Sequence, residues 1–269
     1  MNSFLLLSAF FYLRNILAVP QTIDIRNANI YLINLKHRKD KLYASTVQLE
    51  LLGLKFTVID AVNGNYLNTF EYNENYPKQL QSLTGIEGLK ADLNSIKFTP
   101  NTPAHVGCWL SHLKALKQIL KQFDDRISLI LEDDFIADGN VIELVNRYLA
   151  QLEKNHEWDL LHAGHCDSKE KCKYFLNENE SICYTEERVF CTHAYIVKNK
   201  AAAKKLFNAG NRELPVLADF FFETADLKRY MVFPHIFKQR KNIEADIKSE
   251  GGIHEELLNN SLELIVNNL

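Results

Sequence analysis

The sequence lacks several features that would assign a protein to a class at once. Its net charge is only −3, so the composition gives no support for a nucleic-acid-binding surface. No apolar run reaches the roughly 18 to 20 residues that span a bilayer, so no stable transmembrane anchor is expected. The five cysteines include no C-x-x-C pair, which argues against a zinc knuckle. No internal repeat, low-complexity tract or interdomain linker is evident.

The length and composition are those of an ordinary globular protein with a sizeable core. The chain has 269 residues, of which 46% are hydrophobic and 24% are charged. This length suits one large α/β domain or two small ones. Because nothing marks a linker, we predict one domain over residues 21–269, preceded by a leader. Sixteen Phe and eleven Tyr fit a packed core and a sugar-binding cleft.

The N-terminal segment is typical of a secretory signal. Residues 4–12 are apolar except for Ser8, and small residues follow around Ala18. No Lys or Arg precedes the apolar run, and Arg14 interrupts it, so a buried N-terminal helix is the alternative. A signal over residues 1–20 predicts the secretory pathway (the lumen of the ER or Golgi) or secretion. The alternative predicts a cytoplasmic protein.

Cysteine placement also favours secretion. Cys108 stands apart, and the other four lie close together: Cys166, Cys172, Cys183 and Cys191. One or two disulfides that pin a loop explain this cluster, and buried thiols are the alternative. Two N-glycosylation sequons, at residues 179–181 and 259–261, would be usable in a secretory lumen.

Three consecutive carboxylates follow a short apolar run at residues 127–131. The run is typical of a strand that is buried on both faces of a sheet. Glu132, Asp133 and Asp134 at its end repel one another and are costly to desolvate. A hard divalent cation such as Mg²⁺ or Mn²⁺ would remove that cost. A solvated acidic turn is the alternative.

A β-α-β unit is predicted near the start of the domain. Strands over residues 30–35 and 56–61 flank a helix that ends at Gly53, which implies parallel strands with a right-handed crossover. The inward face of this helix is predicted to carry Tyr43, Val47 and Leu51. Ligands bind beyond the carboxyl ends of such strands, where Asn34, Arg38 and Asp60 lie. Arg38 could meet a diphosphate there, although a helix start with solvated charges is the alternative.

A helix is predicted to begin with Thr102 as N-cap and Pro103 in its first turn. Its inward face carries Trp109, Leu113, Leu116 and Leu120. Gly107 weakens a helix, so it is expected to permit a close backbone approach. His112 is either a hydrogen-bonded core residue or a ligand. Further strands are predicted at 158–165, 191–197 and 230–234, helices at 140–154 and 200–208, and an exposed loop at 166–191.

Several separated segments, in this order, resemble glycosyltransferase family 25. They are Ile33-Asn34-Leu35 with Arg38, Asp40 and Lys41; Asp60-Ala61 with Gly64; Gly107-x-x-x-Ser111-His112; Leu131-Glu132-Asp133-Asp134; Trp158-Asp159-Leu160-Leu161; Thr192-His193-Ala194-Tyr195; and Leu214-Pro215-Val216 with Asp219. No single motif is specific, but their shared order and spacing is. The sequence departs from the family pattern at Lys41, where Arg is usual, so bidentate geometry is lost there.

The resemblance implies a single GT-A-like, Rossmann-type α/β domain with a mostly parallel sheet flanked by helices. It also implies an inverting enzyme that moves a hexose, galactose first, from a UDP-sugar to a hydroxyl of a glycan or glycoprotein. A divalent metal, Mn²⁺ or else Mg²⁺, would stabilise the departing diphosphate. A carbohydrate- or nucleotide-binding module without turnover is one alternative. A metal-dependent hydrolase is another, although the nine His residues are scattered.

The resemblance also suggests roles for individual residues. Alternate residues of an extended segment share a face, so Glu132 and Asp134 are expected to bind the metal, and Asp133 the donor sugar or ribose. The other expected donor-binding residues are Asn34, Arg38, Asp60, Ser111 and His112. Asp219 is the candidate catalytic base, because an apolar setting would raise its pKa. An N-cap role is the alternative for Asp219.

Overall fold

The computed structural model describes residues 23–69, 78, 81–82, 84–86, 102–177, 179, 181–191, 193–211, 219, 222–223 and 225–240. The leader, the sequon at 259–261 and Glu180 of the other sequon lie outside the described residues, so the predicted signal remains a prediction. No helix of the described residues is both long and apolar enough to cross a bilayer.

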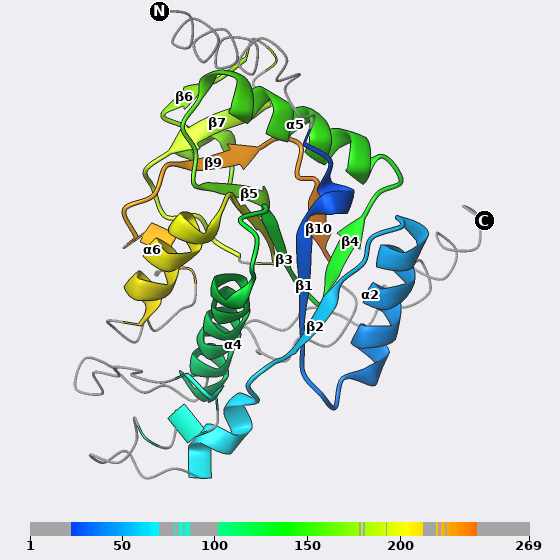
Figure 1. The fold of residues 1–269 in the computed structure, drawn as a ribbon, viewed down its shortest axis with the longest axis vertical. Coiled ribbons are helices and arrows are strands. Elements are labelled where there is room, and N and C mark those ends of the chain that lie inside the picture. The colour runs from blue at the N-terminus through cyan, green and yellow to red at the C-terminus, as the bar shows by residue number, and fades with distance from the viewer. Residues whose placement is uncertain are drawn as a thin grey trace, which may run out of the picture.

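The described helices and strands alternate along most of the chain (Figure 1). The α-helices are α2 (Lys39–Leu51), α4 (Thr102–Lys121), α5 (Val141–Asn155) and α6 (Lys200–Gly210), and the 3₁₀ helices are η1 (Ile25–Asn27), η2 (Gly64–Thr69) and η4 (Lys169–Lys171). The strands are β1 (Asn29–Asn34), β2 (Thr57–Asp60), β3 (Ser128–Glu132), β4 (Phe135–Ala137), β5 (Leu160–Gly164), β6 (Tyr174–Phe175), β7 (Ile182–Thr185), β8 (Ala194–Val197), β9 (Arg229–Val232) and β10 (Phe237–Gln239). The predicted helix at 102 begins at Thr102 and has Pro103 in its first turn.

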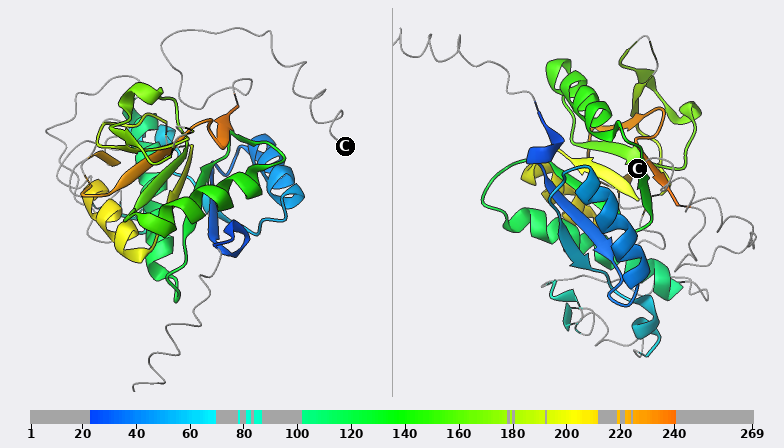
Figure 2. Two further views of the ribbon diagram at one scale, coloured as in Figure 1. Left: turned by 90° about the horizontal axis from the view of Figure 1, so that it is seen from above. Right: turned by 90° about the vertical axis from the view of Figure 1, so that its right-hand side faces the viewer.

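Eight strands of the described chain form one sheet in the order β2-β1-β3-β8-β5-β9-β7-β6. β1 pairs in parallel with both β2 and β3, and β5 pairs in parallel with β9. β8 runs antiparallel between β3 and β5, and β7 runs antiparallel to β9. β4 and β10 form a separate antiparallel pair. The predicted α/β class, a mostly parallel sheet flanked by helices, is confirmed (Figure 2).

The sheet is buried on both faces, as the apolar runs predict. In β1, Tyr31 and Ile33 belong to a core cluster that includes α4 and α6. The alternate residues Ile30 and Leu32 belong to a second cluster that includes α5 and part of α2. β3 divides its side chains in the same way, with Ile130 in the first cluster. This two-sided burial explains why these strands are continuous apolar runs.

The inward face of α2 is not the predicted one. Its buried residues are Lys41, Ser45 and Leu49. Tyr43 and Leu51 are 73% and 70% exposed, so the prediction that they face the core is wrong. The predicted end of this helix is confirmed, because Gly53 has a φ of +67° and its N–H donates to Glu50 O.

A polar face of α2 points inward because the helix packs over the acidic turn after β3. Its side chains there meet backbone groups of residues 133–137 as well as apolar neighbours. Ser45 Oγ donates to Asp133 O at 2.8 Å in a buried hydrogen bond. The Gln48 side chain donates to Phe135 O at 3.2 Å and accepts from Ala137 N at 3.0 Å. A polar face turned toward backbone groups gives no apolar periodicity, so the hydrophobic pattern could not identify it.

The segment 166–191 is more than the exposed loop that its composition predicts. β6 and β7 form a hairpin, and β7 pairs with β9 as part of the main sheet. Ile182 and Cys183 are fully buried. Two disulfides, Cys166–Cys191 and Cys172–Cys183, hold the segment, which confirms the predicted cross-linking.

Candidate functional site

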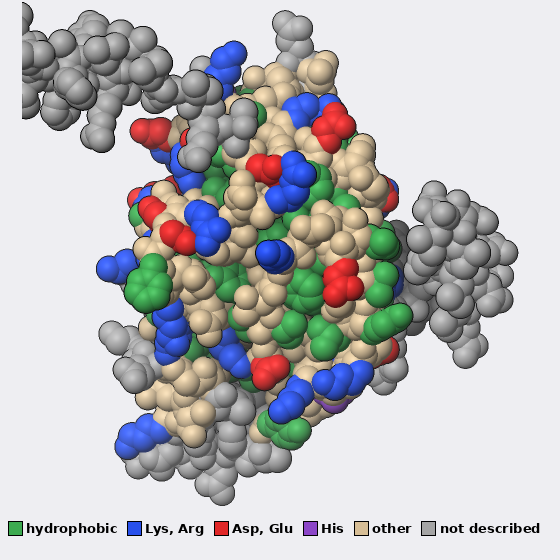
Figure 3. All heavy atoms as spheres, turned by 45° about the vertical axis from the view of Figure 1, so that its right-hand side comes forward, with side chains coloured by type: hydrophobic (Ala, Val, Ile, Leu, Met, Phe, Trp, Pro, Cys, Tyr) green, Lys and Arg blue, Asp and Glu red, His purple; other side chains and the backbone are tan. Residues whose placement is uncertain are grey.

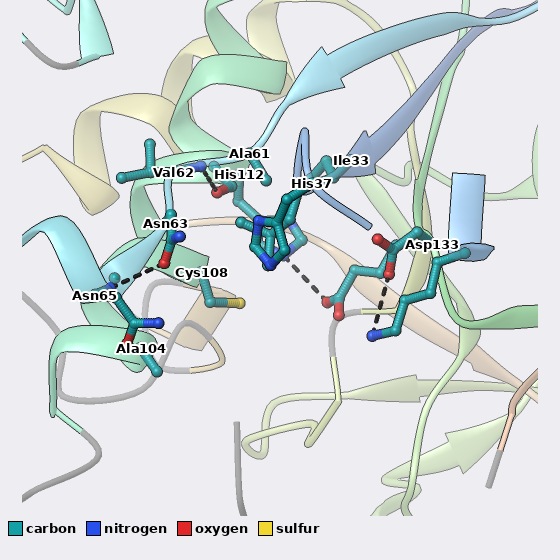
Figure 4. Close-up of a pocket in the computed structure, with 15 residues that line it drawn as sticks. Ile33, His37, Ala61, Val62, Asn63, Asn65, Ala104, Cys108, His112 and Asp133 are labelled. Carbon is teal, nitrogen blue, oxygen red and sulfur yellow. Dashed lines mark hydrogen bonds and ion pairs between the residues drawn. The ribbon is translucent and has the colours of Figure 1, made fainter. Parts of the chain in front are cut away.

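A cavity of about 160 Å³ lies beyond the carboxyl ends of β1, β2 and β3. It is lined by the β1–α2 connection, the loop after β2, one face of α4 and the end of β3. Figure 4 shows Asn63, Asn65 and Cys108 on one side, Asp133 on the other, and the rings of His37 and His112 between them. Polar side chains from four segments therefore converge on one concave site, which is the usual form of a ligand pocket.

A glycine sets how closely α4 approaches this cavity. A Cβ on Gly107 would lie 2.6 Å from Val62 O and 2.8 Å from Gly64 N, so only glycine fits there without a shift. Ser111, one turn later, accepts from Val62 N at 2.8 Å and donates to Gly107 O at 2.6 Å. The predicted close approach at Gly107 is therefore confirmed, and Ser111 ties the loop after β2 to the helix.

The three consecutive carboxylates point in three directions. β3 ends at Glu132, and residues 133–134 form a turn, so strand alternation does not extend beyond Glu132. Glu132 and Asp133 both line the cavity, whereas Asp134 does not. The expectation that Glu132 and Asp134 share a face opposite Asp133 is therefore wrong in its geometry. The reason is that a turn, unlike a strand, has no two-residue period.

Each carboxylate meets a different partner. Glu132 Oε1 lies 3.2 Å from His112 Nε2. Asp133 Oδ1 lies 3.6 Å from Lys41 Nζ in a mostly buried ion pair. Asp134 Oδ2 accepts from the Gln239 side chain at 2.9 Å.

Asp134 carries an uncompensated oxygen. Its Oδ1 is buried and has no hydrogen-bond partner within the described part of the chain. Burial, and next the nearby Glu132 carboxylate, raise the pKa of Asp134. A cation would offset both effects, because it replaces the lost solvation and neutralises the repulsion. Asp134, with Glu132 nearby, therefore fits a divalent ion that prefers oxygen ligands.

His112 is fully buried and hydrogen-bonded through both ring nitrogens. Nδ1 lies 3.1 Å from Tyr195 Oη, and Nε2 lies 3.2 Å from Glu132 Oε1. The ring also lines the cavity. The core alternative for His112 is thus confirmed, and its ligand role in the cavity stays a prediction. One turn before it on α4, Cys108 lines the same cavity.

The remaining residues expected to bind the donor lie around the cavity without lining it. Asn34 is buried, and its Nδ2 donates to Leu35 O at 2.7 Å. Its Oδ1 has no partner among the described residues. Arg38 forms an ion pair with Asp40 at 2.8 Å. Asp60 is opposite Asn34 in the β1–β2 ladder but is exposed.

Asp219 lies in a setting that suits a base. Burial raises its pKa to about 6, and the Glu132 carboxylate adds to this, while a hydrogen bond from the Cys191 backbone opposes it. Its interaction with both Glu132 and His112 places it within electrostatic reach of the cavity. Cys191 has a φ of +69°, which is costly for a residue with a side chain, and such strain gathers at functional sites.

Several cavity residues were not predicted from the sequence. They are His37, Lys41, Asn63, Asn65 and Cys108. Lys41 was noted only as a departure from the family pattern, and Gly64, within the turn that begins at Asn63, only as part of a family motif. A signal was available for this turn, because a loop that directly follows a parallel strand lies at the ligand-binding edge of the sheet.

The outer surface agrees with the near-neutral composition. On the face shown in Figure 3, acidic and basic side chains are interspersed. Exposed ion pairs such as Lys238–Asp138 at 2.9 Å are spread in the same way. This mixed pattern is unlike the basic stripe of a nucleic-acid-binding face.

The cavity lies at the carboxyl ends of the strands, where open α/β sheets bind their ligands. The profile of "Glycosyltransferase family 25 (LPS biosynthesis protein)" matches residues 27–222. The chain belongs to this family, which confirms the resemblance found in the sequence.

Among curated relatives, procollagen galactosyltransferase 1-B of Xenopus laevis is 31% identical over 228 residues, covering 76% of this chain and 34% of that protein. Procollagen galactosyltransferase 2 of Homo sapiens is 24% identical over 221 residues, also covering 76% and 34%. The chain thus spans about a third of the length of these relatives.

Two solved structures were compared with the chain. Galactosyltransferase LgtC, in complex with donor and acceptor sugar analogues, is 10% identical with a TM-score of 0.34, covering 79% of this chain and 87% of its own. A197 from STIV is 9% identical with a TM-score of 0.38, covering 83% and 100%. Both TM-scores are too low to bear on the site or its chemistry.

Proposed function

We propose that the protein is a metal-dependent, inverting glycosyltransferase that moves a hexose, galactose first, from a UDP-sugar to a hydroxyl of a glycan or glycoprotein. Family membership, with the polar cavity at the ends of β1, β2 and β3, is the observation that carries this proposal. The names of the two procollagen galactosyltransferases support galactose as the sugar.

The donor nucleotide is assigned to the edge formed by β1 and β2. Asn34 Oδ1 is a buried acceptor that a base or ribose donor could satisfy. Arg38, at the N-cap of α2, and Lys41, in its first turn, supply positive charge. Asp60, Ser111, His112 and Asp133 complete the set of donor contacts, for the ribose and sugar hydroxyls.

The leaving group is assigned to the carboxylates after β3. Glu132 and Asp134 would hold a divalent ion, Mn²⁺ or else Mg²⁺, whose charge offsets that of the departing diphosphate. The uncompensated Oδ1 of Asp134 supports this role. Gln239 fixes the other oxygen of Asp134, so the ligand is held in place before the donor arrives.

Asp219 is assigned the role of base. The acceptor oxygen bonds to the anomeric carbon as the bond from that carbon to the phosphate oxygen breaks. The acceptor proton passes to Asp219, and UDP leaves with the bonding electron pair. A pKa of about 6 suits a base that works near neutral pH, because the carboxylate is then ionised yet retains basicity.

A secretory compartment is proposed on the two disulfides, which persist in oxidising surroundings. The predicted mature N-terminus near Gln21 can be checked by N-terminal sequencing of the protein from a eukaryotic secretion host. A cytosolic product that retains Met1 and carries reduced cysteines would contradict this assignment.

The proposed function is tested by donor binding, which needs no knowledge of the acceptor. UDP, UDP-galactose and UDP-glucose are each titrated by calorimetry with Mn²⁺, with Mg²⁺ and with a chelator, and donor hydrolysis is followed in parallel. We expect UDP-galactose to bind in the presence of Mn²⁺, and we expect this binding to be lost when chelator is present. The control is Glu143→Gln, an exposed carboxylate on α5, which should bind normally. Absence of nucleotide binding under every metal condition would contradict the proposal.

A further inference from the structure

Three side chains of the ligand types that bind transition metals lie together in the lining of the cavity. The ligand atoms of Cys108, His112 and Glu132 all lie within 4.8 Å of one another. This set differs from the Asp134 position in its chemistry, because it offers sulphur and nitrogen beside one oxygen. It shares Glu132 with that position.

The fold brings these three side chains together for simple reasons. Cys108 and His112 are four residues apart on α4, so they lie on the same helix face, one turn above the other. Glu132 is the last residue of β3 and reaches the same helix face from the sheet. The backbone contact at Gly107 draws this turn of α4 inward, which brings the Cys108 sulphur into the cavity (Figure 4).

His112 is already oriented as a metal ligand would be. Its Nδ1 meets Tyr195 Oη at 3.1 Å, so the phenol fixes the ring and leaves Nε2 directed at Glu132. Metal-binding histidines usually have their second nitrogen held in this way. The separation of 3.2 Å between Nε2 and Oε1 suits a hydrogen bond and also suits two ligands of one tetrahedral ion.

We propose that Cys108, His112 and Glu132 form a binding site for a Zn²⁺-class ion, which shares Glu132 with the oxygen site at Asp134 but differs from it in its other ligands. Thiolate, imidazole and carboxylate are the three ligand types that zinc combines, whereas Mn²⁺ and Mg²⁺ prefer oxygen alone. All three residues line the cavity, so the fourth position of the ion opens to solvent or a small ligand.

The consequence for transfer rests on the proposed function, whereas the site itself does not. Glu132 cannot serve both ions at once, and an ion at Cys108 also occupies the cavity. Zinc binding should therefore inhibit transfer, and the inhibition should depend on the thiol.

Cobalt is the probe, because Co²⁺ replaces Zn²⁺ and gives a thiolate charge-transfer absorption in the near ultraviolet. The other four cysteines are in disulfides, so this band can come only from Cys108. The full chain is freed of metal with chelator, kept without reductant and titrated with Co²⁺. Zn²⁺ is then added to displace the cobalt.

We expect the charge-transfer band in the wild type and in Asp134→Asn, and its loss in Cys108→Ser with Zn²⁺ affinity reduced by roughly tenfold or more. Glu143→Gln should keep the band. A folded wild type without the band, or a band that survives in Cys108→Ser, would overturn the proposal. The outcome is distinguishable from failure of the proposed function, because Asp134→Asn should lose Mn²⁺-dependent binding of UDP and yet keep the cobalt band.

Discussion

The two ends of the sheet differ in how well their polar groups and strands are paired. At one end, the braced half (β9, β7 and β6) is held by antiparallel ladders, by the Cys172–Cys183 disulfide and by surface pairs such as Lys173–Glu186 at 2.7 Å. At the other, the site half (β2, β1 and β3) gathers polar groups in a cavity. In the turn after β3, Asp134 Oδ1 is buried without a hydrogen-bond partner among the described residues, and burial raises the pKa of Asp134.

This difference fits the proposed function, in which Asp134 binds a metal ion. Under that proposal, burial of the unpartnered carboxylate costs stability until the ion binds, and the packing of the rest of the fold offsets this cost. One contact links the disulfide-held segment 166–191 to the candidate base. Cys191 is in the Cys166–Cys191 disulfide, and its backbone N–H donates to the carboxylate of Asp219.

The largest effect is expected from removal of the buried Asp134 carboxylate. Asp134→Asn should lower turnover by roughly 10²- to 10³-fold, because it removes the carboxylate assigned to the metal. The melting temperature should stay nearly the same, since a neutral amide avoids the burial cost that raises the pKa of Asp134. Activity assays with Mn²⁺ and calorimetric melting give both numbers. Full activity of this variant in chelator would contradict the assignment.

The next largest effect is expected at Asp219. Asp219→Asn should lower kcat by roughly 10²- to 10⁴-fold, as for the loss of a general base. In the wild type, kcat should fall as pH falls through about 6, because protonated Asp219 cannot accept a proton.

The stability effect at Asp219 has the opposite sign. The folded-state pKa of about 6 lies above the ordinary 3.8, so protonation favours the folded state. This contribution is full below pH 3.8 and is lost as pH rises through about 6. Asp219→Asn should abolish that slope in urea unfolding measured across this pH range. A variant that keeps the wild-type pH profile of kcat would exclude Asp219 as the base.

The two disulfides are expected to affect turnover differently, because only the Cys166–Cys191 disulfide includes a residue that contacts Asp219. Cys172→Ser with Cys183→Ser should cost about 2 to 3 kcal/mol of unfolding free energy and leave turnover unchanged. Cys166→Ser with Cys191→Ser should cost about 3 kcal/mol and also lower turnover, because Cys191 positions Asp219. Urea unfolding and steady-state assays measure the two effects. Equal turnover in both double variants would show that the disulfide at Cys191 does not help to position Asp219.

The smallest predicted effect concerns Arg38. Arg38→Ala should raise the donor KM by roughly tenfold or more, through loss of a charge-assisted phosphate contact of about 1.5 to 3 kcal/mol. Acceptor KM should change little. Arg26→Ala is the matched control, since Arg26 also pairs with an acidic neighbour, Asp24 at 2.6 Å, but lies in η1 before β1, at the opposite end of the strand from the cavity. An unchanged donor KM would shift the phosphate contact to Lys41, which does line it.

Much of the architecture could be predicted, because it depends on local pattern. The β1-α2-β2 unit, the two-sided burial of β3 and the close approach at Gly107 all followed from apolar runs and one glycine. The same reasoning located the acidic strand end and the raised pKa of Asp219. Each of these features leaves a signal in the local sequence, although the burial that raises the pKa of Asp219 and the contact at Gly107 are themselves tertiary.

The features that could not be predicted depend on partners far away in sequence. The polar face of α2 is turned inward by backbone groups of the β3–β4 turn, about 90 residues later. The hairpin of β6 and β7 exists because β9 offers a free edge for β7. The nested pairing of the four clustered cysteines follows from that hairpin.

The α/β class, the family and the acidic strand end follow from the sequence alone, because they depend on local patterns and on the order of motifs. What each carboxylate faces depends on the fold. Glu132 ends a strand and meets a helix, Asp133 turns back to Lys41, and Asp134 turns away to Gln239. In a turn, the direction of each side chain depends on the local dihedral angles and on the elements packed around it. Neither can be predicted from the presence of three adjacent acidic residues.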